Sequence, residues 1–173
     1  MARAQWDLDA FAPLYQRYYR PVFGYCHRRL AHREAAADAT SQTFAKALTG
    51  IHGFRSGSVA AWLFTIARHV VIDTVRSRRF HIDLAAAANV SDGQPLPEDE
   101  VIASDQQRAL FAALRTLTPD QRHVVELRLS GLTSPEIATV LGLTTGAVKA
   151  SQSRAYARLR AALADEHIFG DPT

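Results

Sequence analysis

The 173-residue sequence contains a single cysteine, Cys26, so the chain cannot form an internal disulfide. An oxidising compartment is therefore not implied. The N-terminal residues 1–7 lack the apolar core of a secretory signal peptide. No uninterrupted apolar run approaches the roughly 20 residues that are needed to span a bilayer. These absences predict a cytoplasmic protein that does not insert into membranes.

Signals for β-strands are also missing, because no segment alternates polar and apolar residues over a sustained length. Motifs that carry chemistry are equally scarce. None of the seven histidines is paired at the spacing of metal ligands, and there is no phosphate-binding loop or nucleophile motif. Cys26 and His27 are adjacent and cannot share a helix face. We therefore expect an all-α protein that is not an enzyme and has no metal or other cofactor.

The formal net charge is only +3, but the charges are unevenly distributed. Arginines crowd residues 68–79, and lysine and arginine crowd residues 149–160. Between these two clusters, residues 83–105 carry six carboxylates and no lysine or arginine. Two basic segments around an acidic interval predict two contacts with one polyanion. Either cluster taken alone is explained equally well as a solvated helix face.

Apolar residues that recur at three- and four-residue steps predict three helices in the first eighty residues. The stripes run over residues 11–26, 37–48 and 63–74, and Pro21 is expected to kink the first helix without ending it. The pattern dissolves from about residue 81 to residue 104. That segment is turn-rich and acidic, which predicts a flexible linker.

Helix boundaries are marked most clearly in the C-terminal part of the chain. Residues 118–121 read Thr-Pro-Asp-Gln, which combines a capping box with proline at the first helical position. Residues 133–136 repeat the device as Thr-Ser-Pro-Glu. Gly142 suits the left-handed residue that ends a helix, and Thr144 or Thr145 can cap the next one. This order predicts a helix-turn-helix whose second helix exposes cations. A hairpin that only packs is the alternative.

Three stretches of sequence, in this order, carry a resemblance to a known family. They are AADATSQTF at residues 36–44, AWLFTIARH at residues 61–69 with Asp73, and LTPDQR at residues 117–122. Together they resemble the extracytoplasmic-function sigma factors, the promoter-recognition subunits of bacterial RNA polymerase. The resemblance extends over residues 11–160.

The resemblance implies two small helical domains. We expect a sigma-two bundle at residues 1–80, a flexible acidic linker at residues 81–104 and a sigma-four helix-turn-helix domain at residues 105–173. The implied function is to bind core polymerase, recognise promoter DNA at two elements and help to open the duplex. A linker of about 25 residues reaches at most roughly 80 Å. That exceeds two helical turns of DNA at about 34 Å each, so one chain can hold both elements.

The resemblance also implies partners. These are core RNA polymerase (the clamp coiled coil of the largest subunit and the flap of the second largest), promoter DNA and an anti-sigma factor. The row that binds polymerase falls on Asp38, Ser41 and Gln42. The family usually has glutamine where Ser41 stands and glutamate where Gln42 stands. Loss of that carboxylate is expected to weaken pairing with clamp arginines unless neighbouring residues compensate.

For the minus-ten element, the family uses the loop before the third helix as a pocket for an extruded base. This loop maps onto Phe54, Arg55 and Ser56. An aromatic platform stabilises an unstacked base by ~1–3 kcal/mol, although Phe54 is equally well explained as a core residue that closes the loop. His69 stands where asparagine is common and can still hydrogen-bond a base edge. The expected phosphate contacts here are three arginines: Arg68, Arg76 and Arg79.

For the minus-thirty-five element, Arg128 and the helix start at Ser134 are expected to meet phosphate, because N–H groups and the dipole at a helix start favour an anion. Lys149 and Arg154 suit guanine acceptors in the major groove. The complete expected set is Arg128, Ser134, Lys149, Ser151, Ser153, Arg154 and Arg158. The two serines are short and leave the preferred bases open.

Three other classes of protein are alternatives. A two-component or quorum-sensing regulator has a similar C-terminal helix-turn-helix, but it carries an α/β domain in front, and the first eighty residues here show no strands. An enzyme is disfavoured by the missing motifs. An adaptor that binds polymerase without DNA is disfavoured by the cations of the second helix.

Overall fold

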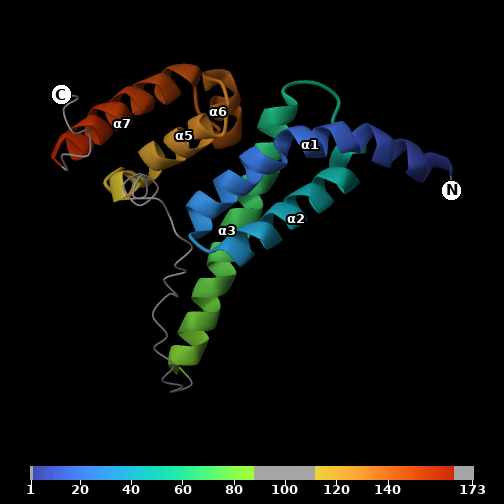
Figure 1. Ribbon diagram of the computed structural model, residues 1–173, viewed down its shortest axis with the longest axis horizontal. Helices are drawn as coiled ribbons and strands as arrows, with labels where there is room; N and C mark the ends of the chain where they lie inside the picture. Colours follow the sequence, from blue (N-terminus) through green and yellow to red (C-terminus); the bar gives the residue numbers. More distant parts are fainter. Residues whose placement is uncertain (1, 88–111, 166–173) are drawn as a thin grey trace, which may run out of the picture. The chain divides into compact units, whose positions relative to one another are not determined.

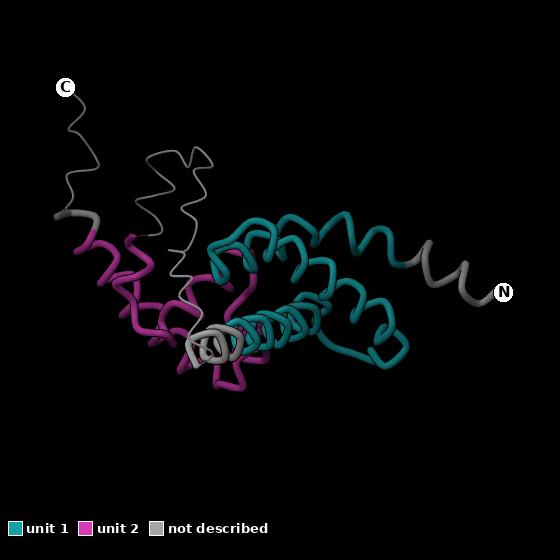
Figure 2. The backbone as a smooth tube through the Cα atoms, turned by 90° about the horizontal axis from the view of Figure 1, so that it is seen from below, with its two compact units in different colours: residues 1–99 teal, residues 100–173 magenta. Residues whose placement is uncertain are grey.

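The computed structural model describes residues 2–87 and 112–165, and every regular element in these two ranges is helical (Figure 1). The chain divides into two compact units, residues 1–99 and 100–173 (Figure 2). The predicted all-α fold of two helical domains is confirmed. No helix among the described residues is long and apolar enough to cross a membrane.

The first unit is built from three helices, α1 (Ala2–Leu30), α2 (Arg33–Gly50) and α3 (Val59–Ala87), each of which contacts the other two. A short 3-10 helix, η1 (Ile51–Gly53), follows α2. The buried face of α2 is rich in alanine, so its neighbours can approach closely. Larger side chains from α1 and α3 fill the remaining core, for example Tyr25, whose ring meets that of Phe64 edge-on at 5.7 Å.

Two features of the long helices bear on the sequence predictions. The helix α1 runs through Pro13 and Pro21 without ending, as expected for the second proline. The helix α3 continues to Ala87, so residues 81–87, predicted as the start of a flexible linker, are helical. Residues 81–87 read HIDLAAA, which contains strong helix formers and neither glycine nor proline, so nothing there ends the helix. The remaining part of the predicted linker, residues 88–104, lies outside the described residues.

The single thiol is expected to be unreactive in the folded protein. Cys26 is completely buried in the first unit, and this burial raises the pKa of its thiol to about 11. The thiolate is the nucleophile, so only about one thiol in a thousand is reactive at pH 8. Iodoacetamide at pH 8 should leave the native chain unlabelled over hours and label it within minutes in guanidinium chloride, as read by mass spectrometry. Fast labelling of the native chain would contradict the buried position.

The second unit contains α5 (Pro119–Leu129), α6 (Ser134–Leu141) and α7 (Thr145–Asp165). The helix α7 contacts both α5 and α6. Leu114, Leu117, Val125 and Ala155 form a buried cluster on which Leu159 packs. Further core residues come from each of the three helices, among them Leu127, Ile137 and Val148.

The predicted helix boundaries of this unit are confirmed by their hydrogen bonds. The backbone N–H of Gln121 donates to the hydroxyl of Thr118 (3.3 Å), and the Gln121 side chain accepts from the N–H of Thr118 (3.2 Å). A carboxylate oxygen of Glu136 accepts from the backbone N–H of Thr133 at 2.7 Å. Gly142 ends α6 with φ +66°, in the left-handed region that glycine favours. The cap before α7 is Thr144, whose hydroxyl accepts from Ala147 N–H at 3.1 Å.

Candidate nucleic-acid interface

The outer face of α7 presents cations on a helix that the core holds in place. Val148 and Ala155 are buried on one side of the helix, while Lys149, Ser153 and Arg154 are exposed on the other. Lys149 and Ser153 are four residues apart and lie one above the other. The structure therefore brings three predicted groove residues onto one accessible face, as a helix that enters a major groove requires.

Ser151 does not belong to that face. We expected it to point outward, but it is only 8% exposed and lies on the same side of α7 as Val148 and Ala155. The spacing of three and then four residues places these three positions on one stripe, so a polar residue type alone was a misleading guide. Its small side chain suits a position where α7 packs against the rest of the unit.

Arg128 makes internal hydrogen bonds that the sequence did not indicate. Its guanidinium donates from Nη1 to the carbonyl of Leu132 at 2.8 Å. From Nη2 it donates to the hydroxyl of Ser134 at 2.6 Å and to the side-chain oxygen of Gln152 at 2.9 Å. One planar fork thus joins α5, the following turn, the start of α6 and the side of α7. The Arg128 guanidinium and the Ser134 hydroxyl thus belong to an internal network, and the phosphate contacts expected of Arg128 and of the helix start at Ser134 stay predictions.

Gln152 was absent from the sequence prediction, and Arg158 has a role beyond the one predicted. Gln152 lies 24 residues from Arg128, and no local pattern signals that contact. Arg158 is exposed, and its Nη1 donates to the side-chain oxygen of Gln121 at 3.3 Å. This bond ties α7 to the capping box of α5, and the exposed guanidinium keeps further donors for a phosphate.

The three residues predicted in the loop before α3 differ in how far they are exposed to solvent. Phe54 is half-buried, and its ring lies 5.3 Å from that of Trp62 at an interplanar angle of 43°. Arg55 and Ser56 are exposed in the loop itself. Phe54 therefore closes the loop against α3 and still presents part of its surface, so both readings of this residue fit its position.

Along α3, the predicted residues divide between two faces. His69 and Arg76 are exposed and seven residues apart, so they share one face of the helix. Arg68 is half-buried, and its Nε is buried without a hydrogen-bond partner. The side chain of Arg79 lies outside the part of the chain that the structure describes.

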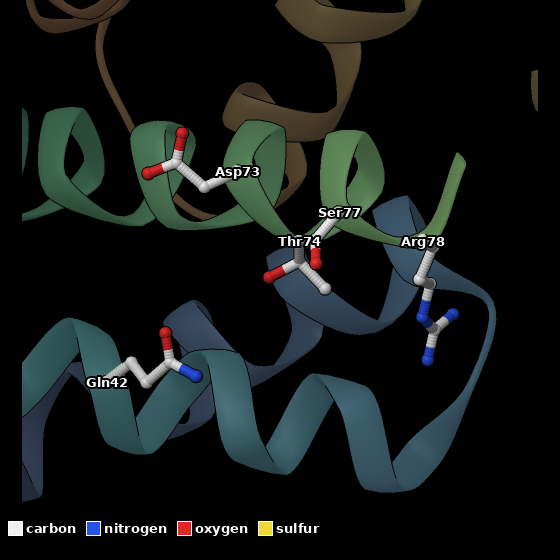
Figure 3. A pocket seen from close by; sticks show the side chains of 5 residues that line it. All are labelled: Gln42, Asp73, Thr74, Ser77 and Arg78. Carbon is white, nitrogen blue, oxygen red and sulfur yellow. The ribbon is translucent and has the colours of Figure 1, made fainter. Parts of the chain in front are cut away.

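The row predicted to bind polymerase is accessible. Asp38, Ser41 and Gln42 are all exposed on α2, opposite the alanines that pack into the first unit. Asp38 and Gln42 are one helical turn apart and Ser41 lies between them. Gln42 also lines a hollow that α2 shares with α3 (Figure 3).

Comparison with known proteins agrees with this division into two units. Sigma-70 region 2 matches residues 14–81, and sigma-70 region 4 matches residues 107–159. The ECF RNA polymerase sigma factor BldN of Streptomyces coelicolor is 37% identical over 92% of this chain, which spans 62% of the length of BldN. The RNA polymerase sigma factor YlaC of Bacillus subtilis is 31% identical over 88% of this chain and 91% of its own length.

A solved structure supports the same assignment. The sigma factor RpoE of Bartonella quintana, crystallised with the anti-sigma factor NepR, matches with a TM-score of 0.71 and 25% identity. The match covers 90% of this chain and 97% of that one. The three sequence stretches, the two helical units and these relatives lead to one conclusion: the chain belongs to the extracytoplasmic-function sigma factors, the subunits that direct RNA polymerase to promoters.

Proposed function

We propose that this chain binds core RNA polymerase in the cytoplasm through α2 and holds promoter DNA at two elements. The proposal rests on the outer face of α7. Lys149, Ser153 and Arg154 are exposed on this face, while Val148 and Ala155 on the opposite side are buried and hold the helix in place. Lysine and arginine on a groove-facing helix suit guanine acceptors, and Arg158 suits phosphate. This second unit binds the minus-thirty-five element.

The first unit binds the minus-ten element with the loop before α3 and the exposed face of that helix. Arg55 and Ser56 surround an extruded base, with part of the Phe54 ring as its platform. His69 hydrogen-bonds a base edge, and Arg76 meets phosphate. Arg68 and Arg79 complete the phosphate contacts and add a salt-dependent, sequence-independent share of the affinity.

The domains that perform these tasks follow the helices. The sigma-two domain ends with α3 at Ala87, and the sigma-four domain begins near residue 105. The acidic segment between them connects the two without any lysine or arginine to compete for DNA. The solved relative RpoE is bound to the anti-sigma factor NepR, and we propose that this chain also binds an anti-sigma factor.

Run-off transcription tests the proposal. Purified chain and core RNA polymerase are mixed with a library of genomic fragments, and the transcripts are sequenced. We expect transcripts that begin at defined sites and depend on the added chain. Core alone and core with the chain heated to unfolding serve as controls. Core binding without any transcript that depends on the chain would overturn the proposal, and so would a failure to bind core.

A further inference from the structure

Asp73 lies in the middle of the α3 row that we propose faces promoter DNA. His69, Asp73 and Arg76 are all exposed, at steps of four and then three residues, so they share one face of the helix. Figure 3 shows the carboxylate of Asp73 pointing away from α2, the helix on which α3 packs. A carboxylate therefore stands between a residue expected to read a base and a residue expected to meet phosphate.

This carboxylate has no partner within the described part of the chain. Asp73 makes no hydrogen bond or ion pair with any residue that the structure describes. His69 and Arg76 are each within one helical turn of it, yet Asp73 holds neither of them in place. The acceptor oxygens of Asp73 are thus available to a partner molecule.

The chemistry of a carboxylate selects which part of DNA that partner is. An ionised carboxylate only accepts hydrogen bonds, and a phosphate group is itself an acceptor of the same charge, so the two repel. The hydrogen-bond donors of DNA lie on its bases. In the major groove these donors are the amino groups of adenine N6 and cytosine N4.

The position of Asp73 along α3 separates it from the extruded base. The helix begins at Val59, just after the loop of residues 54–56 that is proposed to hold that base. Asp73 follows Val59 by 14 residues, which is about 21 Å at 1.5 Å per residue. Base pairs are stacked at about 3.4 Å, so this distance corresponds to several base steps. The face of an α-helix fits the major groove of a duplex, and Asp73 therefore meets a paired base.

We infer that Asp73 is a specificity-determining residue for the minus-ten element and that its carboxylate accepts a hydrogen bond from the amino group of adenine or cytosine. The inference rests on the proposed function of α3. Every base pair presents one such amino group in the major groove, on the adenine or on the cytosine. Asp73 therefore reads the orientation of one pair, with adenine or cytosine preferred over thymine or guanine on one strand.

Transcription from variants of one promoter tests the inference. A fragment that yields a transcript in the run-off assay is changed at each base pair of its minus-ten region in turn, and is transcribed by core polymerase with the full-length chain. At one pair, the wild type should prefer adenine or cytosine over thymine or guanine by about five-fold or more. Asp73→Ala and Asp73→Asn should reduce this preference to within two-fold and keep the others, because alanine has no acceptor and an amide both donates and accepts.

Two further variants serve as controls. Glu34→Gln removes a carboxylate that is exposed on α2 instead of α3, and it should keep every preference of the wild type. His69→Ala shows whether Asp73 acts directly. The two residues are about 6 Å apart along the helix, which exceeds the spacing of base pairs, so His69→Ala should change the preference at a different pair. Circular dichroism shows whether each variant is folded.

Unchanged preferences of folded Asp73→Ala overturn the inference. A change at the same pair that His69→Ala affects also overturns it, because Asp73 would then act through His69. The inference is equally wrong if the preference lost in Asp73→Ala is for guanine or thymine. If the wild type yields no transcript that depends on the added chain, the proposed function itself fails.

Discussion

Replacing Arg154 with alanine is expected to weaken binding of the upstream promoter element about ten- to a hundred-fold. Arg154 is exposed on the outer face of α7, and its guanidinium has no partner among the described residues. A bidentate contact between arginine and guanine contributes ~1–3 kcal/mol, or about 5- to 150-fold, and the expected loss lies within this range. The measurement is a footprint of the holoenzyme, titrated on a fragment that yields a transcript in the run-off assay.

Arg115→Ala is the control for this prediction. Arg115 is also exposed in the second unit and carries the same charge, but it lies before α5 and outside the recognition helix. Its backbone carbonyl accepts a hydrogen bond from Arg122 at 3.2 Å, and alanine keeps that acceptor. We expect its footprint to match the wild type within two-fold. Equal footprints for Arg154→Ala and the wild type would remove Arg154 from the interface.

The helix boundaries of the second unit could be predicted because their causes are local. The hydroxyl of Thr118 and the N–H that it accepts from are three residues apart, and the same holds for Thr144 and Ala147. Gly142 needs only its own backbone conformation to end α6. Each of these signals is contained within a few consecutive residues, so the sequence alone identifies where such helices start and stop.

The roles of Ser151 and Arg128 depend on distant neighbours and could not be found in this way. Ser151 is buried because of how α7 packs against the other helices. Its spacing from Val148 and Ala155 is a weak sequence signal of this burial. Arg128 finds one partner 6 residues away and another 24 residues away, and only the assembled unit brings these together. The hollow between α2 and α3 is a similar case, since Gln42 and Arg78 are far apart in the sequence.

The C-terminal end of α3 shows what apolar periodicity alone does not predict. The apolar period seen over residues 63–74 fades by about residue 80, which predicts a boundary there. The helix continues because its next residues, among them Leu84 and the alanines that follow it, favour helix on their own. Apolar periodicity therefore predicts the patterned part of such a helix, and helix propensity predicts how far the helix extends beyond that part.

Arg128→Ala is expected to destabilise the second unit by about 2–4 kcal/mol, because it removes a charged donor from three acceptors in a half-buried network. Arg128→Lys should cost nearly as much, since a single ammonium cannot reproduce the planar fork. Both tryptophans lie in the first unit, so hydrogen exchange of the full-length chain, read by mass spectrometry, is the suitable measurement. Peptides from α5, α6 and α7 should lose protection, while those from α1 to α3 should not.

DNA binding then separates positioning from direct contact. If Arg128 sets the tilt of α7, both variants bind the upstream element more weakly, yet the dependence of affinity on salt concentration keeps its slope, because no phosphate contact is lost. If Arg128 instead met a phosphate, the lysine variant would bind almost normally and the alanine variant would lower the slope by about one.

Gln152→Ala is the matched test from the other side of the network. It removes one acceptor of Arg128 and no charge, so it should weaken binding with an unchanged slope. Full protection and normal binding in Gln152→Ala and Arg128→Lys would show that the network does not position the recognition helix.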